Sequence, residues 1–362
     1  MTSSPRVAQR ALAPRPGTDS RGRGVSRTRV PALEAAGRDE PPAGAGGEGP
    51  VPGQPELPMA QAEPVPALPP DMVTRCELVA VRGVPLPSNT AQLWGQIWGF
   101  QARPDDLLIC TYPKAGTTWV QEIVDMIQQD GDPQKCCRAP IYQRIPFLEL
   151  CPPRPLPRGF EEAVAMPPPR TLKTHLPLEP VPPSFWEQDC KVIYMARNPK
   201  DNAVSYFHFQ RMNQWLPAPG CWDQYLENFL SGGVPWGSWF DHVRAWWDAR
   251  DKHRILYLFY EELHKDPRSE IQKVGRFLGR ELPEPVLETI VERTSFESMR
   301  ENPMANYSTV PPFILDHAVS PFMRKGTVGD WTTQFTVAQS ERFDAKWAQR
   351  MEGSDLRFHT RL

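Results

Sequence analysis

A short loop near residue 115 combines the residue types that hold a phosphate-like anion. The segment TYPKAGTTW, residues 111–119, follows the apolar run DLLIC and precedes VQEIVDMI, whose apolar positions repeat at helical spacing. Such a strand-to-helix turn directs backbone N–H groups and the positive end of the helix dipole toward one point. Gly116 lets the backbone approach an anion closely, and Lys114 adds a positive charge. Because Thr117 and Thr118 add hydroxyl donors, the segment predicts an anion site.

The order of residues in this loop separates it from the nucleotide-binding P-loop. In the pattern GxxxxGK[ST] the lysine follows the glycine, whereas Lys114 precedes Gly116 here. A Mg-nucleotide kinase is therefore disfavoured. The spacing alone leaves a simpler interpretation open, in which the loop is an ordinary strand-to-helix turn with an exposed lysine.

A lysine and a histidine stand two residues apart in LKTHLP, residues 172–177. On a strand, Lys173 and His175 point to the same face. The lysine charge disfavours the imidazolium form, so the pKa of the histidine is expected to fall. A neutral imidazole can act as a general base near pH 7. Taken alone, however, the pattern is more typical of a surface histidine beside a surface lysine.

Two further segments carry donors that suit a second phosphate. In ARNPKDNAVSYFHF, Arg197 follows an apolar run, and Ser205 comes eight residues later, just over two helical turns away. Arginine offers a planar fork to a phosphate, and serine offers a hydroxyl group. In FMRKGTVGDW, Arg324, Lys325 and Gly326 form a second basic turn. Each segment also fits a simpler interpretation. Arg197 could bind a loop carbonyl, and FMRKGTVGDW could be a flexible surface loop.

The elements that must position these segments alternate between strand and helix. Apolar runs that predict or contain strands occupy residues 106–112, 169–176, 190–197 and 253–263, and helical patterns occupy residues 117–129, 198–212, 222–230, 238–250, 266–279 and 337–351. This alternation predicts a single α/β domain with a central parallel β-sheet flanked by helices. Ligands bind beyond the carboxyl ends of strands in such sheets. Lys114, His175 and Arg197 stand at three of these ends, so we expect them to converge.

Composition excludes several classes of protein. The formal net charge of −2 at pH 7 gives no electrostatic basis for binding nucleic acid. No apolar run is long enough for a transmembrane helix, and the N-terminus lacks the apolar core of a secretory signal. The seven cysteines show no paired CxxC spacing, which favours reduced thiols over a disulfide framework or a zinc site. We therefore expect a cytoplasmic protein that binds no membrane.

Residues 1–70 are predicted to form a disordered extension, and residues 71–362 the folded domain. No Phe, Tyr or Trp occurs before Trp94, and proline is frequent, so the extension buries too little apolar surface to offset the entropy of ordering it. Its first 30 residues are rich in arginine, as in organelle presequences, but Pro and Gly interrupt them and no amphipathic pattern is present. Met59 offers an alternative start, which leaves the role of residues 1–58 open.

Together, the four segments resemble the cytosolic sulfotransferases. YPKAGTTW is similar to the loop that holds the 5′-phosphosulfate of PAPS (3′-phosphoadenosine 5′-phosphosulfate). ARNPKDNAVSYFHF is similar to the 3′-phosphate segment, and RKGTVGDW to the C-terminal cofactor loop. The resemblance runs from about Val81 to the C-terminus. Within the family, FQRMNQWLPAPG and WGSWFDHV resemble the phenol-type family 1, most of all its 1C-type branch.

The resemblance implies a P-loop-like site for PAPS and no metal. By similarity, Trp119 and Phe296 pack on the adenine, with Tyr260 and Thr294 near its edge. The residues implied to bind PAPS are Lys114, Ala115, Gly116, Thr117, Thr118, Trp119, Arg197, Ser205, Tyr260, Thr294, Phe296, Phe322, Met323, Arg324, Lys325 and Gly326.

The implied reaction is the in-line transfer of a sulfuryl group to an acceptor hydroxyl. The resemblance assigns Lys114 to the bridging oxygen of the leaving group and His175 to the proton of the acceptor. Lys173 supports the transferring group. Ser205, by similarity, also holds Lys114 away from PAPS until the acceptor arrives, which limits hydrolysis.

The acceptor is expected to be a small phenol or a related hydroxyl compound. By similarity, Phe147 and Phe209 sandwich a phenol ring, and Tyr142 and Leu150 occupy neighbouring pocket positions. For the last two, an ordinary core role fits equally well. The acceptor residues implied are Lys173, Thr174, His175, Phe147, Phe209 and Tyr142. Phenols, hydroxyarylamines and iodothyronines all fit, and the sequence does not choose among them.

The dimerisation motif of the family, KxxxTVxxxE, is altered here. The corresponding segment, residues 332–341, reads TTQFTVAQSE, so Thr332 replaces the lysine while Thr336, Val337 and Glu341 remain. The substitution removes one charge pair, and an exposed pair contributes only about 0–1 kcal/mol. We therefore expect a weak homodimer rather than none.

The main alternative is a catalytically inactive PAPS- or PAP-binding protein of the same fold. The presence of Lys114, Lys173, His175, Arg197 and Ser205 argues against it, although a blocked acceptor pocket leaves no trace in a sequence. A Golgi-type carbohydrate sulfotransferase is disfavoured because no membrane anchor is evident.

Overall fold

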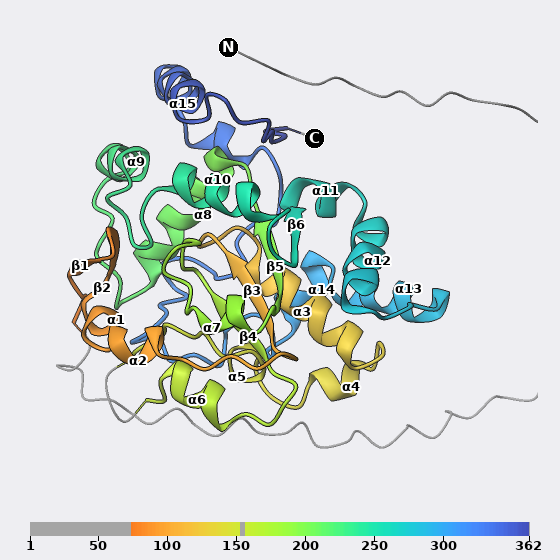
Figure 1. Ribbon diagram of the computed structural model, residues 1–362. Helices are drawn as coiled ribbons and strands as arrows, with labels where there is room; N and C mark the ends of the chain where they lie inside the picture. The colour runs from red at the N-terminus through yellow and green to blue at the C-terminus, as the bar shows by residue number, and fades with distance from the viewer. Residues whose placement is uncertain (1–73, 153–155, 362) are drawn as a thin grey trace, which may run out of the picture. The chain divides into compact units, whose positions relative to one another are not determined.

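The computed structural model describes residues 74–152 and 156–361, and the predicted disordered extension, residues 1–70, lies outside the described residues. All described residues belong to one compact unit in which strands and helices alternate (Figure 1). The strands are β1 (Leu78–Val81), β2 (Val84–Pro87), β3 (Leu107–Thr111), β4 (Thr171–Thr174), β5 (Lys191–Ala196) and β6 (Ile255–Phe259). The helices are α1 (Ser88–Gln92), α2 (Trp94–Trp98), α3 (Thr117–Gln128), α4 (Pro133–Cys136), α5 (Ile141–Arg144), α6 (Gly159–Ala165), α7 (Ser184–Glu187), α8 (Pro199–Met212), α9 (Trp222–Ser231), α10 (Trp239–Ala249), α11 (Tyr260–Lys265), α12 (Pro267–Leu278), α13 (Glu284–Arg293), α14 (Phe296–Glu301), the 3-10 helix η2 (Asp330–Thr333) and α15 (Val337–Arg350).

The central sheet has four parallel strands in the order β4-β3-β5-β6. In its register Ile109 of β3 pairs with Lys173 of β4, and Cys110 pairs with Tyr194 of β5. The strands β1 and β2 form a separate antiparallel hairpin. The predicted parallel sheet is therefore confirmed.

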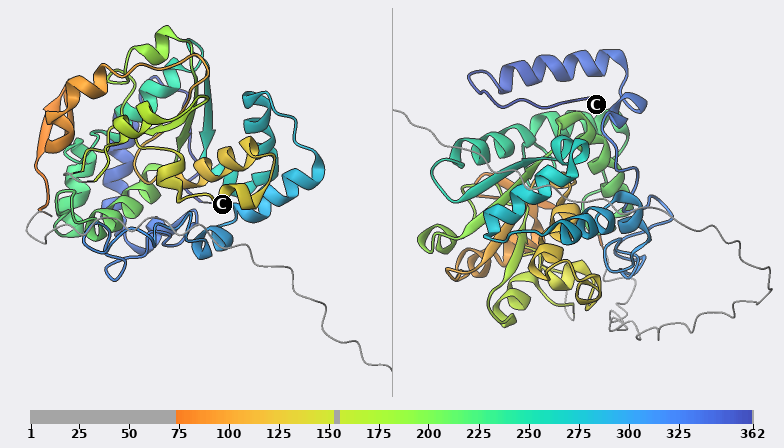
Figure 2. Two further views of the ribbon diagram at one scale, coloured as in Figure 1. Left: turned by 90° about the horizontal axis from the view of Figure 1, so that it is seen from below. Right: turned by 90° about the vertical axis from the view of Figure 1, so that its right-hand side faces the viewer.

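Both faces of the sheet are buried, which explains why β3, β5 and β6 are mostly apolar. Along β3, Leu108 and Cys110 belong to one apolar core, whereas Leu107 and Ile109 belong to a second core on the opposite face. The first core includes aromatic residues of α8, α9 and α10, and the second includes apolar residues of α3, α12 and α13. Figure 2 shows helices on both sides of the sheet.

Helix starts at the carboxyl end of the sheet follow local sequence signals. The side chain of Asn198 caps α8 by accepting a hydrogen bond from the backbone of Asp201, and Pro199 occupies the first helical position. Gly116 precedes α3 in a left-handed conformation with φ of 102°. The loops after β3, β4 and β5 therefore begin helices or turns at the same edge of the sheet.

Residues 332–341 lie near the C-terminus. Thr332 is part of η2, and Thr336 forms a capping box with Gln339 at the start of α15. Val337 is 76% exposed, the largest exposure among the large apolar side chains of the described ranges. In the described part of the chain, no helix combines the length and apolar character needed to cross a membrane. The seven cysteines are all free thiols.

Candidate functional site

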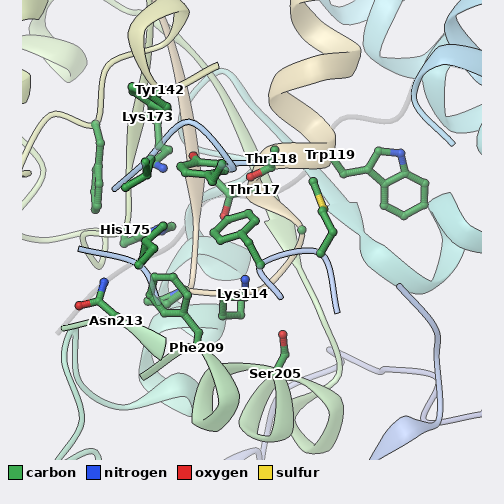
Figure 3. Close-up of a pocket in the computed structure, with 18 of the residues that line it drawn as sticks. Lys114, Thr117, Thr118, Trp119, Tyr142, Lys173, His175, Ser205, Phe209 and Asn213 are labelled. Carbon is green, nitrogen blue, oxygen red and sulfur yellow. The ribbon is translucent and has the colours of Figure 1, made fainter. Parts of the chain in front are cut away.

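A cavity of about 960 Å³ lies at the carboxyl ends of the central strands (Figure 3). Its walls include every site residue predicted from the sequence except Ala115 and Thr174, which are buried in the protein. Leu150 also lines the cavity. The structure therefore brings together predicted site residues from Lys114 to Gly326, about 210 positions apart in the chain, as the convergence of strand ends predicts.

The loop after β3 has a geometry that requires glycine at one position. A Cβ atom on Gly116 would lie 2.7 Å from the Sδ atom of Met195 and 2.8 Å from the ring of Tyr260. The side chain of Asn202 donates a hydrogen bond of 2.7 Å to the carbonyl oxygen of Pro113, which ties the loop to α8. The first turn of α3, beginning at Thr117, consequently presents its N–H groups to the cavity at a fixed position.

Lys114 is the basic group closest to this turn in sequence, and its ammonium is largely desolvated. Its Nζ atom lies 4.0 Å from the ring centre of Phe322 and 4.8 Å from that of Phe209. Burial lowers the pKa of Lys114 to about 7, and the charge of Arg197 adds to the effect. Ser205 faces the same region from α8, but no hydrogen bond joins it to Lys114 among the described residues. The predicted restraint of Lys114 by Ser205 therefore stays a prediction.

Two arginines hold unsatisfied donors beside this loop. Arg197 donates hydrogen bonds to the carbonyl oxygens of Lys114 at 3.3 Å and Thr327 at 3.0 Å, and Arg324 pairs with Asp330 at 2.5 Å. The Nε atoms of both arginines are buried without a hydrogen-bond partner among the described residues. Buried donors of this kind are costly unless an acceptor reaches them. The pair therefore fits an anionic group such as a phosphate.

An aromatic wall adjoins these arginines. The rings of Trp119 and Tyr260 lie 5.3 Å apart, and the guanidinium of Arg197 lies 4.3 Å from the ring centre of Tyr260. Gly326 packs so closely on Phe296 that a Cβ atom would lie 2.1 Å from the ring. Thr294 is buried and donates its hydroxyl hydrogen to the carbonyl of Ile290 at 2.7 Å, so only its acceptor lone pairs remain for a ligand.

The ring of His175 has a defined tautomer. Its Nδ1 atom lies 2.8 Å from the carbonyl oxygen of Thr111, and since a carbonyl only accepts, Nδ1 carries the proton. The Nε2 atom is therefore the proton acceptor of the ring. Burial lowers the pKa of His175 well below 6.5, and the charge of Lys173 adds to this effect. The sequence predicted the direction from the lysine alone, but burial is the larger cause.

Aromatic side chains form the wall beside His175. The ring of Phe147 lies 4.8 Å from the imidazole and 5.9 Å from the ring of Trp236. The Nζ atom of Lys173 lies 4.6 Å from the ring centre of Phe147. Further along the wall, Tyr142 shares a hydrogen bond of 3.0 Å with Thr309. This part of the cavity suits a flat apolar ring whose hydroxyl group reaches His175.

Sequence reasoning missed the groups that fix the backbone of His175. The carboxylate of Glu149 accepts hydrogen bonds from the backbone N–H of His175 at 2.6 Å, the hydroxyl of Thr174 at 2.8 Å and the indole N–H of Trp236 at 3.1 Å. His242 donates from Nε2 to the carbonyl oxygen of His175 at 3.0 Å. An acidic residue inside the apolar run PFLEL was the signal for Glu149, whereas nothing marked His242.

The basic loop near the C-terminus is also anchored by residues that the sequence did not single out. Asp201 of α8 accepts hydrogen bonds from the backbone N–H groups of Gly329 at 2.8 Å and Trp331 at 2.9 Å. Asp330 forms ion pairs with both Arg324 and Lys325. Within the described residues, no group of three or more His, Cys, Asp or Glu side chains is arranged to hold a metal ion.

Comparison of the sequence with known proteins identifies close relatives. Residues 104–355 match the family model described as the Sulfotransferase domain. The chain is 58% identical over 292 residues to Sulfotransferase 1C2 of Homo sapiens, covering 81% of this chain and 98% of that protein. It is 53% identical over 289 residues to Sulfotransferase 1A1 of Canis lupus familiaris, covering 80% and 98%.

Comparison of the structure gives a concordant result. The chain resembles mouse sulfotransferase SULT7A1 complexed with PAP, with a TM-score of 0.64 and 34% identity over 77% of this chain and 95% of that one. It also resembles retinol dehydratase in complex with androsterone and the inactive cofactor PAP, with a TM-score of 0.69 and 27% identity over 76% and 89%.

Proposed function

Because the chain belongs to the sulfotransferase family, we propose that it transfers the sulfuryl group of PAPS to the hydroxyl group of small phenolic acceptors, with His175 as the general base. The observation that carries this proposal is the tautomer of His175, whose proton acceptor Nε2 belongs to a cavity that also holds a lysine-bearing anion loop. The PAP in the structures of two relatives supports PAPS as the co-substrate, because PAP is what remains of PAPS after the transfer.

The residues around the cavity fit both phosphates of PAPS. When bound, PAPS supplies an activated sulfuryl group on its 5′-phosphate. The first turn of α3 and Lys114 suit the 5′-phosphosulfate, because they combine N–H donors with a desolvated charge. The unsatisfied donors of Arg197 and Arg324 suit the 3′-phosphate. Trp119 and Phe296 offer apolar faces to the adenine.

The transfer uses three side chains in different roles: His175, Lys173 and Lys114. His175 accepts the acceptor proton at Nε2 as the acceptor oxygen forms its bond to sulfur. Lys114 stabilises the charge that develops on the 5′-phosphate oxygen as its bond to sulfur breaks, and Lys173 neutralises the sulfuryl oxygens. Donors held in place at developing charge each contribute about 3 kcal/mol. The products are the sulfated acceptor and PAP.

The acceptor wall supports a ring-bearing hydroxyl compound. Phe147 lies against His175, and Phe209 lies near Lys114, so a flat ring between them brings its hydroxyl to the base. Tyr142 also lines this cavity, and its hydroxyl shares a hydrogen bond with Thr309. The co-crystallised androsterone of retinol dehydratase belongs to that protein, and it agrees with an acceptor of ring type.

Two further features are proposed on the sequence argument. Residues 1–70 form an extension outside the catalytic domain of residues 71–362, in a cytoplasmic enzyme. Residues 332–341 form a weak dimer contact, and the exposed Val337 at the start of α15 is available for it.

The test is transfer of labelled sulfate from PAPS to a panel of simple phenols, together with calorimetric binding of PAP. We expect both binding and transfer. Tight binding of PAP without transfer to any phenol would instead support the catalytically inactive alternative.

A further inference from the structure

Glu162 brings a carboxylate without a partner to the acceptor end of the cavity. Among the described residues, three carboxylates line the cavity: Glu149, Glu162 and Glu297. Glu149 is engaged by three donors, and Glu297 is exposed beside Phe296, on the adenine side. The carboxylate of Glu162 has no hydrogen bond or ion pair within the described ranges. It is therefore the acid at the acceptor end of this cavity that is free to meet a ligand.

The placement of Glu162 follows from the packing of α6 on the acceptor wall. Gly159, the first residue of α6, approaches Phe147 so closely that a Cβ atom would lie 1.7 Å from the carbonyl oxygen of Phe147. The backbone N–H of Gly159 also donates to the carbonyl oxygen of Leu150 at 2.9 Å. Residues three apart lie on the same helix face, so Glu162 follows Gly159 along the side that meets the cavity. Phe147 thus contacts α6 through its backbone and His175 through its ring.

The electrostatic setting of Glu162 favours a cation. Burial raises the pKa of Glu162 to about 7, and no neighbouring positive charge offsets the effect. The negative charge of Glu162 also contributes to raising the pKa of Tyr142 on the same wall, after burial and Tyr307. Toward the reaction centre the cavity is basic, with Lys114, Lys173 and other cations. Within the acceptor part of the cavity, a cationic ligand would therefore find favourable charge at the Glu162 end.

We propose that Glu162 selects phenolic acceptors that carry a protonated amine on a short chain, by pairing with the ammonium group while the phenol hydroxyl faces His175. The inference rests on the proposed function, because it concerns the acceptor of the same reaction. A ring lying against Phe147 extends from the base toward α6, so a substituent opposite the hydroxyl points to the helix that carries the carboxylate. The amine neutralises a partly buried charge that the free protein leaves uncompensated.

The experiment compares two acceptors that differ by one amine, tyramine and 4-ethylphenol. The measured quantity is the ratio of their kcat/KM values, tyramine over 4-ethylphenol. In Glu162→Gln we expect this ratio to fall about tenfold, because a charge-assisted hydrogen bond is lost, and we expect the fall to lie mainly in the KM of tyramine. Glu161→Gln is the matched control, since Glu161 is the adjacent acid on α6 and pairs with Arg158 at 3.6 Å. It should keep the ratio of the parent protein.

A second variant reverses the charge. In Glu162→Lys the ratio should fall further, and 3-(4-hydroxyphenyl)propanoate, which carries a carboxylate in place of the amine, should gain relative to 4-ethylphenol. Equal ratios in the parent, Glu162→Gln and Glu162→Lys proteins, with 4-ethylphenol still sulfated, would overturn this inference and leave the proposed function standing. Absence of transfer from PAPS to either acceptor by the parent protein would overturn both.

Discussion

The carbonyl oxygen of Thr111 accepts a hydrogen bond from Nδ1 of His175 at 2.8 Å. Thr111 ends β3 and leads into the lysine-bearing loop, whereas His175 directly follows β4. The pairing of these two strands therefore fixes the proton of the imidazole as well as its position. The end of β3 thus determines both where the anion loop begins and which tautomer the proposed base adopts.

The buried imidazole predicts a particular pH dependence. The pKa of His175 lies well below 6.5, because burial and the charge of Lys173 disfavour the protonated ring. The base is therefore already neutral at pH 7, and the acid limb of the kcat/KM profile should lie below pH 6.5. Steady-state rates between pH 5 and 8 measure it. An acid limb centred at or above pH 7 would contradict this assignment.

Binding of PAP should take up a proton near pH 8. The pKa of Lys114 is about 7 in the free protein, so at pH 8 its amine is mostly neutral. An anion beside it raises that pKa, so the complex holds a proton that the free protein lacks. Affinity for PAP should then fall as the pH rises above 7, by at most about tenfold per pH unit.

Calorimetry in buffers of different ionisation enthalpy measures this proton uptake. Lys114→Met should remove most of the uptake at pH 8 and flatten the pH dependence. An unchanged uptake in this variant would assign the proton to another group.

Glu149 should make stability fall as the pH rises toward 7. Burial raises its folded pKa from 4.5 to about 7, so the folded protein keeps a proton that the unfolded chain releases. The contribution to stability is complete below pH 4.5 and is lost as the pH rises through 7, by at most about 3 kcal/mol. The Glu149→Gln variant has no carboxyl group to titrate at this position. Its free energy of unfolding, taken relative to that of the parent protein, should therefore increase between pH 5 and 8. Urea unfolding across this range would show a constant difference if the idea is wrong.

Gly116→Ala should abolish PAP binding and destabilise the fold. The residue has φ of 102°, and the added methyl group would press on Met195 and Tyr260. We expect a loss of stability of about 1–3 kcal/mol from backbone strain, with further loss from the clash. Gly279→Ala is the matched control, because Gly279 has φ of 77° but nothing within 4 Å of the new Cβ atom. Thermal unfolding and PAP titration of both variants separate strain from the clash at the site.

The parts of the fold that sequence reasoning predicts depend on local signals. The apolar runs, the Asn198 cap and the glycine in the anion loop all act within a few residues, and the parallel order of strands follows from alternation with helices. Partnerships across the chain leave no such signal. Glu149 meets Trp236 and His242 meets His175 only after folding, so these supports of the base became visible in the structure alone.

Sulfuryl transfer by His175→Ala tests the central claim most directly. Initial rates from labelled PAPS to 4-ethylphenol are compared with those of the parent protein, and PAP titration verifies that the cofactor site is intact. The account predicts that kcat falls by about a hundredfold or more while PAP still binds, since the general base is lost. A His175→Ala protein that binds PAP and retains a kcat close to that of the parent would contradict the role of His175 as the base.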